Sequence, residues 1–561
     1  MKISSQLANN IDYSSAKTQT HLKNLIRRTC AAKNIPLREN YPDPVKLAAL
    51  VLEDLKAVIE GQFPIESIPD PLTRQVRDHE AFSETRRRTY IGRPEYFEAL
   101  DRHATGLPLN RSPGTFSPTG GEGRDEGATD KPLLLLGDSG SGKSALLANW
   151  VAHWRQDHPK DFILQHYIGG TADSADHWRL MSRLMAEIKR WSGDPEAVPT
   201  EHDDILKDFP LWLAKARARA GHQGVRFIVV LDALNQLEDH DHARLLGWLP
   251  EHPFTGPLRL IVSTLSGQAG ADDPLAALQP RHWPVLRVQP LTVAERRRMI
   301  ADYLARFSKK LDEPRLERLA AAPPAANPLY LKILLDDLRV TGTHERLDER
   351  LTEYLAAPDI PALLKQVLAR YQCDYERDRP GLVREALGLI WAARRGLAET
   401  ELLQLLRPKN DAASPSSIHY PPSSVPQLAP ALWTPLRAAL EDSLVDRGGI
   451  LNFAHDFLRT AVDQAFGSDE ERRKTLRLQL ADYFEAQPIT GRTCDELPWL
   501  LKETNSLPRL RACLLQIDHF LLIKKRDEEE LRRYWVEQLQ EQKTMGKAYV
   551  ASFESWSREP R

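Results

Sequence analysis

KPLLLLGDSGSGKSALLANWVAHW, residues 131–154, joins a run of four leucines to a helical pattern through a glycine-rich turn. The turn has the spacing G-x-x-x-x-G-K-S, and its glycines allow backbone angles that side chains forbid, so successive amide N–H groups can surround a phosphate. In such a loop Lys143 approaches the β- and γ-phosphates, and the Ser144 hydroxyl ligates Mg²⁺. The strand before the turn and the helix after it are the context that this motif requires. We therefore predict a nucleotide-binding P-loop made of Gly137, Asp138, Ser139, Gly140, Ser141, Gly142, Lys143, Ser144 and Ala145.

Short apolar runs alternate with helical segments from residue 133 to about residue 290. This alternation is typical of an α/β fold in which a parallel sheet carries helices on both faces. An additional strand candidate separates the P-loop from the next motif in the sequence, which favours the AAA-like branch of P-loop NTPases. The predicted strands are Leu133–Leu136, Phe162–Ile168, Phe227–Leu231, Leu258–Thr264 and Val285–Val288.

The segment RFIVVLDALNQLED, residues 226–239, ends an apolar run with an acid. A P-loop needs an acid at the end of a nearby strand to hold the Mg²⁺ ion, so we predict Asp232 and Ser144 as its ligands. In the AAA-like branch a carboxylate just beyond this acid usually activates the attacking water, but here Asn235 and Gln236 follow. Amides orient water without accepting its proton, so we expect slow hydrolysis unless Glu238 or Asp239 reaches the site. The predicted catalytic residues are Lys143, Asp232, Asn235 and Gln236.

The length and charge of the chain exclude several classes of protein. A chain of 561 residues is too long for one hydrophobic core, and roughly three or four domains are expected. Lys and Arg number 76 against 78 Asp and Glu, so a protein that coats a polyanion is excluded. The N-terminus carries no secretory pattern, and no apolar stretch approaches the roughly 20 residues that span a bilayer. We expect a cytoplasmic protein without a membrane partner.

Patterns outside the sheet region predict further, helical domains. Thr292 and Glu295 have the spacing of a capping box and predict a helix start. Two apolar runs joined across Arg447, Gly448 and Gly449 predict a hairpin, which after helices is typical of a winged helix. Leu47, Val51, Leu55 and Ile59 predict a helix that packs through one face. The predicted domains are an N-terminal helical connector at 1–78, the P-loop domain at 79–290 with a disordered insertion at 104–131, a helical lid at 291–375, a winged helix at 376–468 and a C-terminal α-helical domain at 469–561.

Several separated segments together resemble one family, the STAND-class signal-transduction ATPases with a NACHT-type domain, in the nephrocystin-3-like and telomerase-associated-protein-like branch. RRRTYIGRPEYFEAL looks like the motif that opens the family's nucleotide domain, and QHYIGGTADSADHW is similar to a strand-end segment of this branch. VVLDALNQLED matches its form of the second motif, and IVSTLSG occupies the position of its sensor strand. ANPLYLKILLDDLR resembles the lid helix, and FAHDFLRTAV resembles the winged-helix segment that bears a histidine. The similarity covers about residues 40–545.

The resemblance implies ATP or ADP as the ligand, Mg²⁺ as the cofactor and additional binding residues. It places the chain beside Ile91, Gly92 and Arg93 near the adenine, Pro328 against the base or ribose, and His455 at the β-phosphate of ADP. The alternative interpretation, in which His455 is a core or surface histidine at the start of a helix without a role in nucleotide binding, stays open. The chain departs from the family where Ser263 and Thr264 stand in place of Arg and where Asn235 stands in place of an acid.

The resemblance also implies a mechanism for the whole molecule. ADP holds a closed monomer, a trigger loosens the lid and the winged helix, ATP replaces ADP, and the open form associates into a homo-oligomer. The trigger and the effector protein are unknown partners, because neither an effector domain nor sensor repeats are evident in the chain. The segment 1–78 looks like the connector after a missing N-terminal domain.

Two other functions remain open at the level of the sequence. A winged helix could make the protein a DNA-binding regulator, but LAPALWTPLRAALEDSLV offers Arg437 against Glu441 and Asp442, so a nucleic-acid partner is not expected. The amides Asn235 and Gln236 also fit a nucleotide-binding scaffold without turnover. The basic runs Arg86–Arg88 and Arg296–Arg298 are interpreted as solvated helix faces.

Overall fold

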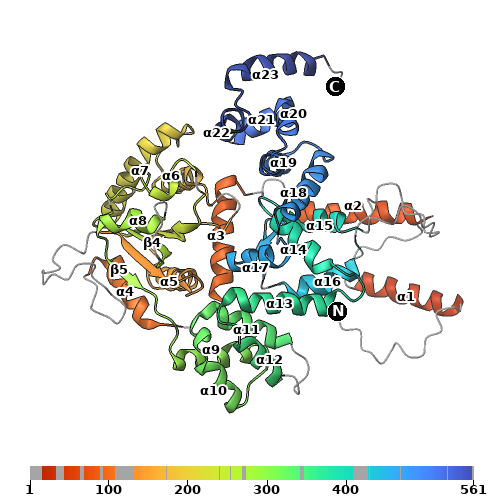
Figure 1. Cartoon of the computed structure of the whole chain (residues 1–561), viewed down its shortest axis with the longest axis horizontal. Coiled ribbons are helices and arrows are strands. Elements are labelled where there is room, and N and C mark those ends of the chain that lie inside the picture. Colours follow the sequence, from red (N-terminus) through yellow and green to blue (C-terminus); the bar gives the residue numbers. More distant parts are fainter. Residues whose placement is uncertain are drawn as a thin grey trace. The chain divides into compact units, whose positions relative to one another are not determined.

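The chain divides into two units, Met1–Pro71 and Leu72–Arg561. The first contains α1 (Ala16–Ala32) and α2 (Pro44–Gln62), and the second contains every described strand (Figure 1). The computed structural model describes residues 16–32, 43–62, 69–88, 92–107, 131–171, 174–238, 240–252, 254–267, 273–340, 347–407, 428, 430–441, 443–467, 469–526 and 528–558. Most of the predicted insertion at 104–131 lies outside these residues.

Five parallel strands form the sheet predicted for the P-loop domain, in the order β2-β3-β4-β1-β5. Each strand agrees with its predicted range to within one residue at either end. The strand that separates the P-loop strand from the Asp232 strand in space is β4, whereas the strand between them in the sequence, β2, lies at the sheet edge. The bounds are β1 (Leu133–Gly137), β2 (Phe162–Tyr167), β3 (Phe227–Asp232), β4 (Leu258–Leu265) and β5 (Val285–Arg287).

Helices cover both faces of this sheet, and the side chains on both sides of its strands are mostly buried. Leu133 and Leu135 point to one face, where they pack with α4 (Pro94–Thr105) and α5 (Lys143–Asp157). Leu134 and Leu136 point to the other, with α6 (His177–Ser192), α7 (His202–Gln223) and α8 (Pro274–Leu278). The period of two along β1 thus divides four consecutive leucines between two cores.

A capped helix starts the helical region that follows the sheet. The hydroxyl of Thr292 accepts a hydrogen bond from the Glu295 N–H, and the Glu295 carboxylate accepts one from the Thr292 N–H, so the predicted capping box is confirmed. The helices of this region are α9 (Val293–Ala305), α10 (Glu313–Ala321), α11 (Pro328–Val340), α12 (Leu347–Leu355) and α13 (Ile360–Tyr375).

A small antiparallel sheet follows, with the strand order β6-β8-β7. The predicted hairpin is confirmed: Gly448 and Gly449 have φ angles of 62° and 87°, which a two-residue type I′ turn requires. The elements here are α14 (Leu382–Ala392), β6 (Leu397–Ala398), α15 (Glu399–Leu405), α16 (Pro430–Ala439), β7 (Leu444–Arg447), β8 (Ile450–Phe453) and α17 (Asp456–Phe466).

The C-terminal part is helical and shares its core with the two preceding regions. One cluster of buried residues runs from Leu291 to Trp535, whereas the clusters of the large sheet lie between Tyr96 and Val288. Within the described residues, no core cluster crosses this boundary. The last elements are α18 (Glu470–Glu485), α19 (Gly491–Glu503), α20 (Leu507–Leu515), α21 (Ile517–Arg526), α22 (Glu528–Arg533), the π-helix η9 (Tyr534–Gln538) and α23 (Gln542–Trp556).

In the first unit, α2 forms as the apolar spacing predicts, but its apolar face is exposed. The side chains of Val51, Leu55 and Ile59 are exposed by 46%, 54% and 56%. The expectation that this face packs is therefore not met by the described residues of this unit. Among the helices that the structure describes, none combines the length and apolar character needed to cross a lipid bilayer.

Candidate functional site

The glycine-rich turn lies at the carboxyl end of β1 and leads directly into α5, as predicted. Gly140 and Gly142 adopt φ angles of 78° and 92°, which favour glycine. The Lys143 ammonium donates hydrogen bonds to the carbonyls of Gly137 at 2.7 Å and Asp138 at 3.0 Å. Burial lowers the pKa of Lys143 below 10.5, and the charge of Asp232 opposes this shift. The lysine and the predicted metal ligand thus belong to one electrostatic site.

Asp232 ends β3 with its carboxylate almost wholly buried, at 1% exposure. The hydroxyl of Ser263, on β4, donates to Asp232 Oδ1 at 2.5 Å and accepts from the N–H of Ala233 at 2.8 Å. Ala233 has a φ of 65°, a left-handed conformation that costs free energy in a residue with a side chain. Ser263 therefore orients the carboxylate of Asp232 and accepts a hydrogen bond from the backbone N–H of the turn that follows it. The sequence did not indicate this role.

The two amides beyond Asp232 lie in the short helix η3 (Leu234–Gln236). Asn235 is half-buried, while Gln236 is exposed and donates through Nε2 to Asp456 Oδ2 of α17 at 3.3 Å. Gln236 also lies close to the segment after β2, since a Cβ added at Gly169 would come within 2.2 Å of Gln236 Oε1. The Gln236 side chain thus connects the edge of the large sheet to the helical region.

Helix α11 lies in the helical region predicted as a lid, which is called the lid below, and its start touches the backbone of the P-loop. Asn327 donates through Nδ2 to the Ser139 carbonyl at 2.9 Å, and the N–H of Leu329 donates to the Gly140 carbonyl at 3.3 Å. A Cβ added at Gly140 would lie 2.8 Å from Asn327 Oδ1, so only glycine lets the lid approach this closely. Glycine at this position serves the lid contact as well as the phosphate loop.

A cavity of about 330 Å³ lies between the P-loop and the lid. Asp138 and Ser141 line it from the P-loop, and the Ser141 hydroxyl is buried without a hydrogen-bond partner in the described part of the chain. The volume lies in the range of small-ligand pockets, which are mostly apolar with a few polar groups. The remaining lining residues are mainly apolar and include Val288, Pro290, Pro323, Pro324, Ala326, Asn327, Pro328, Tyr330, Pro358 and Phe457.

The segment predicted near the adenine joins the P-loop domain to the start of the lid. The buried guanidinium of Arg93 donates to Glu295 Oε1 at 2.5 Å and to the carbonyls of Gln289 and Pro290 at 2.9 and 3.1 Å. The Gly92 carbonyl accepts from Arg298 at 2.6 Å. Ile91 lies outside the described residues. The Arg93 side chain therefore links this segment to the start of the lid, and its N–H groups donate to protein acceptors.

His455 precedes α17 and lies beside Arg86 and Lys332. Burial and the two positive charges lower its pKa well below 6.5, so the ring is neutral at pH 7. Arg86, on α3 (Pro71–Arg87), donates to the neighbouring Ala454 carbonyl at 3.0 Å, and its Nε has no partner among the described residues. The electrostatic attraction of Asp232 acts on this guanidinium. The interpretation of Arg86 as a solvated residue is therefore wrong, because the fold turns it toward the acid.

The chain resembles long curated proteins over most of its own length. It is 26% identical over 536 residues to a TPR repeat-containing protein of Dictyostelium discoideum, covering 88% of this chain and 31% of that protein. It is 27% identical to nephrocystin-3 of Homo sapiens, covering 76% and 31%, and 25% identical to telomerase protein component 1 of Rattus norvegicus, covering 62% and 14%. The similarity expected to the last two is confirmed, and the chain spans less than a third of each of these relatives. No family model matches it.

Solved P-loop proteins resemble the structure only loosely. The Orc1 protein of Aeropyrum pernix, solved with DNA, is 15% identical with a TM-score of 0.30, covering 67% of this chain and 91% of that one. A Walker-type ATPase of Pyrococcus abyssi is 14% identical with a TM-score of 0.28, covering 59% and 91%. The strand order and the P-loop geometry, rather than these values, define the fold.

Proposed function

We propose that the chain binds ATP and ADP with Mg²⁺ and acts as a slow, nucleotide-dependent conformational switch. The observation that carries the proposal is the P-loop at the end of β1, with Lys143 in the electrostatic field of the buried Asp232 and an apolar cavity opening beside it. Backbone N–H groups at the start of α5 would hold the phosphates. Ser144 and Asp232 would hold the metal, and the proline-lined cavity would receive the base.

Slow hydrolysis follows from the groups beyond Asp232. Glu238 faces Arg395 at 3.6 Å, so its carboxylate is not placed as a general base for water, and the Gln236 amide cannot accept a proton. Asp239 lies outside the described residues. Asn235 and Gln236 would orient the water without taking its proton. A bound nucleotide would therefore persist long enough to define a state of the molecule.

The switch rests on how the helical region meets the sheet. The two regions have separate cores, and polar contacts join them near the nucleotide site: Asn327 to Ser139, Gln236 to Asp456, and Arg86 to Ala454. A γ-phosphate between them would bias these contacts without disrupting either core. Moving the population from mostly closed to mostly open takes about 5.5 kcal/mol of differential affinity.

Pro328 and His455 receive roles within this proposal. Pro328 lines the cavity and would contact the base or ribose, and the neutral ring of His455 would donate a hydrogen bond to the β-phosphate of ADP. Release of this contact would free α17 with the lid, and the open form would associate into a homo-oligomer. The trigger and the effector are partners of a longer signalling pathway.

The test is to identify the co-purified nucleotide and to measure the molecular mass with ADP and with a non-hydrolysable ATP analogue. Tightly bound ADP in a monomer and growth in mass with the analogue are expected. Single-turnover phosphate release separates a slow ATPase from a scaffold without turnover. A chain that binds neither nucleotide, or that keeps one mass with both, contradicts the proposed switch.

A further inference from the structure

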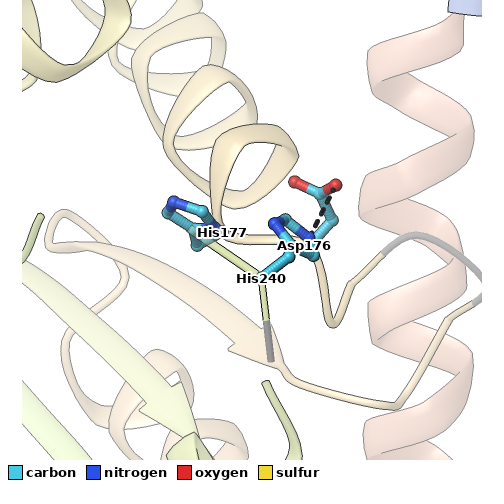
Figure 2. A group of neighbouring side chains, drawn as sticks. All are labelled: Asp176, His177 and His240. Atoms are coloured by element: carbon cyan, nitrogen blue, oxygen red, sulfur yellow. Dashed lines mark ion pairs between the residues drawn. The ribbon is translucent and has the colours of Figure 1, made fainter. Parts of the chain in front are cut away.

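A second group of polar side chains lies at the end of β2 and β3, away from the P-loop strand. Asp176 and His177 start α6, and His240 lies in the loop after η3 (Figure 2). Each offers one ligand atom, and the three atoms lie within 4.8 Å of one another. Asp176 is 8% exposed and His177 is 2% exposed. Two imidazoles and one carboxylate, mostly withdrawn from solvent, are a donor set that transition metals accept.

Local structure holds these side chains in place. Asp176 caps α6 by accepting from the Arg179 N–H at 3.1 Å, and its other oxygen faces His240 Nε2 at 3.5 Å (Figure 2). The N–H of Glu238 donates to the Ala175 carbonyl at 2.9 Å, which ties the His240 loop to the start of α6. The ligand atoms are therefore brought together by backbone contacts as well as by their own charges.

His240 also has the supporting partner that metal-bound histidines need. Its Nδ1 faces Asp241 Oδ2 at 3.3 Å, which leaves Nε2 directed at Asp176. Asp241 accepts from Trp178 Nε1 at 3.1 Å and pairs with Arg533 at 3.3 Å. Metal-bound histidines typically donate their second ring nitrogen to a carboxylate in this manner, which sets the orientation of the ring.

An unsatisfied atom in the cluster points to a ligand. The Nδ1 of His177 is buried and has no hydrogen-bond partner in the part of the chain that the structure describes. Buried polar nitrogens are nearly always hydrogen-bonded or coordinated. The His177 ring packs against Trp178, His240 and Trp248 at centroid distances of 4.4, 5.2 and 6.2 Å, so water is largely excluded from it.

We propose that Asp176, His177 and His240 bind one divalent transition-metal ion of the Zn²⁺ class, a site that goes beyond the proposed nucleotide switch. Zn²⁺ binds imidazole nitrogen and carboxylate oxygen at about 2.0–2.2 Å, so the three side chains would close by roughly 1 Å around the ion. Glu238 Oε2, which lies 3.7 Å from His240 Nε2, is placed to complete the coordination. Imidazole favours Zn²⁺ over Mg²⁺, which distinguishes this site from the one at Ser144 and Asp232.

The ion would stabilise the loop that follows Asp232. It would join His240 to the start of α6, and two neighbours of His240 contact the helical region, Glu238 through Arg395 and Asp241 through Arg533. The role is structural, because the cluster lies beyond the β2–β3 edge and the P-loop starts at β1 on the other side of β4.

The test titrates Zn²⁺ alone into the purified full chain after dialysis against a chelator, with Co²⁺ absorption as a second measurement. One ion per chain is expected. His177→Gln and His240→Gln should weaken binding by more than about 100-fold, and Asp241→Asn by about 10–100-fold through the orientation of His240. His153→Gln is the matched control, because His153 is 47% exposed on α5 and belongs to no cluster described above.

Two further variants keep the inference testable. Asp176→Asn retains a capping side chain, so α6 should fold while the ion is lost, even if His177→Gln does not fold. Lys143→Ala should bind Zn²⁺ unchanged while losing nucleotide, which separates failure of this site from failure of the proposed function. Equal Zn²⁺ binding by His240→Gln and the unmodified chain, or loss of Zn²⁺ in Lys143→Ala, would overturn the inference.

Discussion

The large sheet and the helical region after Leu291 approach the candidate nucleotide site in different ways. The sheet domain presents Lys143 from the first turn of α5 and Asp232 from the end of β3, where backbone carbonyls hold the lysine and Ser263 holds the acid. The helical region presents Asn327 and Asp456 through isolated hydrogen bonds of 2.9 and 3.3 Å. The sheet side of the site is thus buried and held by several contacts, whereas the helical side touches it through single hydrogen bonds. In the proposed switch, the sheet side would bind the phosphates and the helical side would move.

The largest expected effect comes from removing the lysine charge on the sheet side of the site. Lys143→Ala should abolish measurable binding of ATP and ADP in calorimetry, a loss of roughly 100-fold or more, because charged hydrogen bonds to the phosphates disappear. Lys131→Ala is the control, since that exposed lysine precedes β1 and donates to the His282 carbonyl at 3.4 Å. Undiminished affinity of the Lys143 variant would remove the P-loop from the site.

The second prediction separates metal chemistry from nucleotide binding. Asp232→Asn should leave most of the nucleotide affinity and lower Mg²⁺-dependent hydrolysis by about 10–100-fold, because a neutral amide is a poor ligand for a hard cation. Phosphate release at saturating nucleotide is the measurement. An unchanged rate would show that another group holds the metal.

The third prediction tests the helical side of the site. His455→Ala should increase the ADP dissociation rate several-fold, about 1 kcal/mol, because a neutral hydrogen bond to the phosphate is lost, and it should lower the monomer fraction. Stopped-flow release of a fluorescent ADP analogue and light scattering measure the two effects. The same dissociation rate together with the same monomer fraction would make His455 a helix-start residue only.

The smallest expected effect concerns the joint between the two regions. Burial would raise the pKa of Glu295, but hydrogen bonds from Arg93 and Thr292 outweigh it and lower the pKa from 4.5 to about 2. A carboxyl group with a lowered pKa stabilises the fold above its unfolded pKa, so this contribution is lost as the pH falls from 4.5 toward 2. Urea unfolding across this window should show a shallower pH dependence for Glu295→Gln than for the exposed control Glu98→Gln. Equal slopes would contradict the role of this ion pair.

The local features of the fold were predictable because each depends on neighbours in the sequence. The strands follow from apolar runs, the start of α9 from Thr292 and Glu295, and the hairpin from Gly448 and Gly449. Arg86 was interpreted wrongly because a run of three arginines resembles a solvated face, and only the tertiary contact with the Ala454 carbonyl shows that one of them turns inward. Ser263 and Asn327 were missed as partners of the site for the same reason, since both act across long sequence separations.

The sequence by itself determined the phosphate loop, because the spacing of three glycines, a lysine and a serine between a strand and a helix encodes backbone geometry locally. It also indicated Asp232 as the candidate metal ligand, because this residue is the first acid after an apolar run that forms a buried strand. Tertiary structure decided which groups meet these residues: β4 inserts Ser263 beside Asp232, α3 brings Arg86, and α6 brings Asp176 and His177 against His240. These contacts depend on how separate elements pack, and side-chain packing between distant segments leaves no periodic signal in the chain.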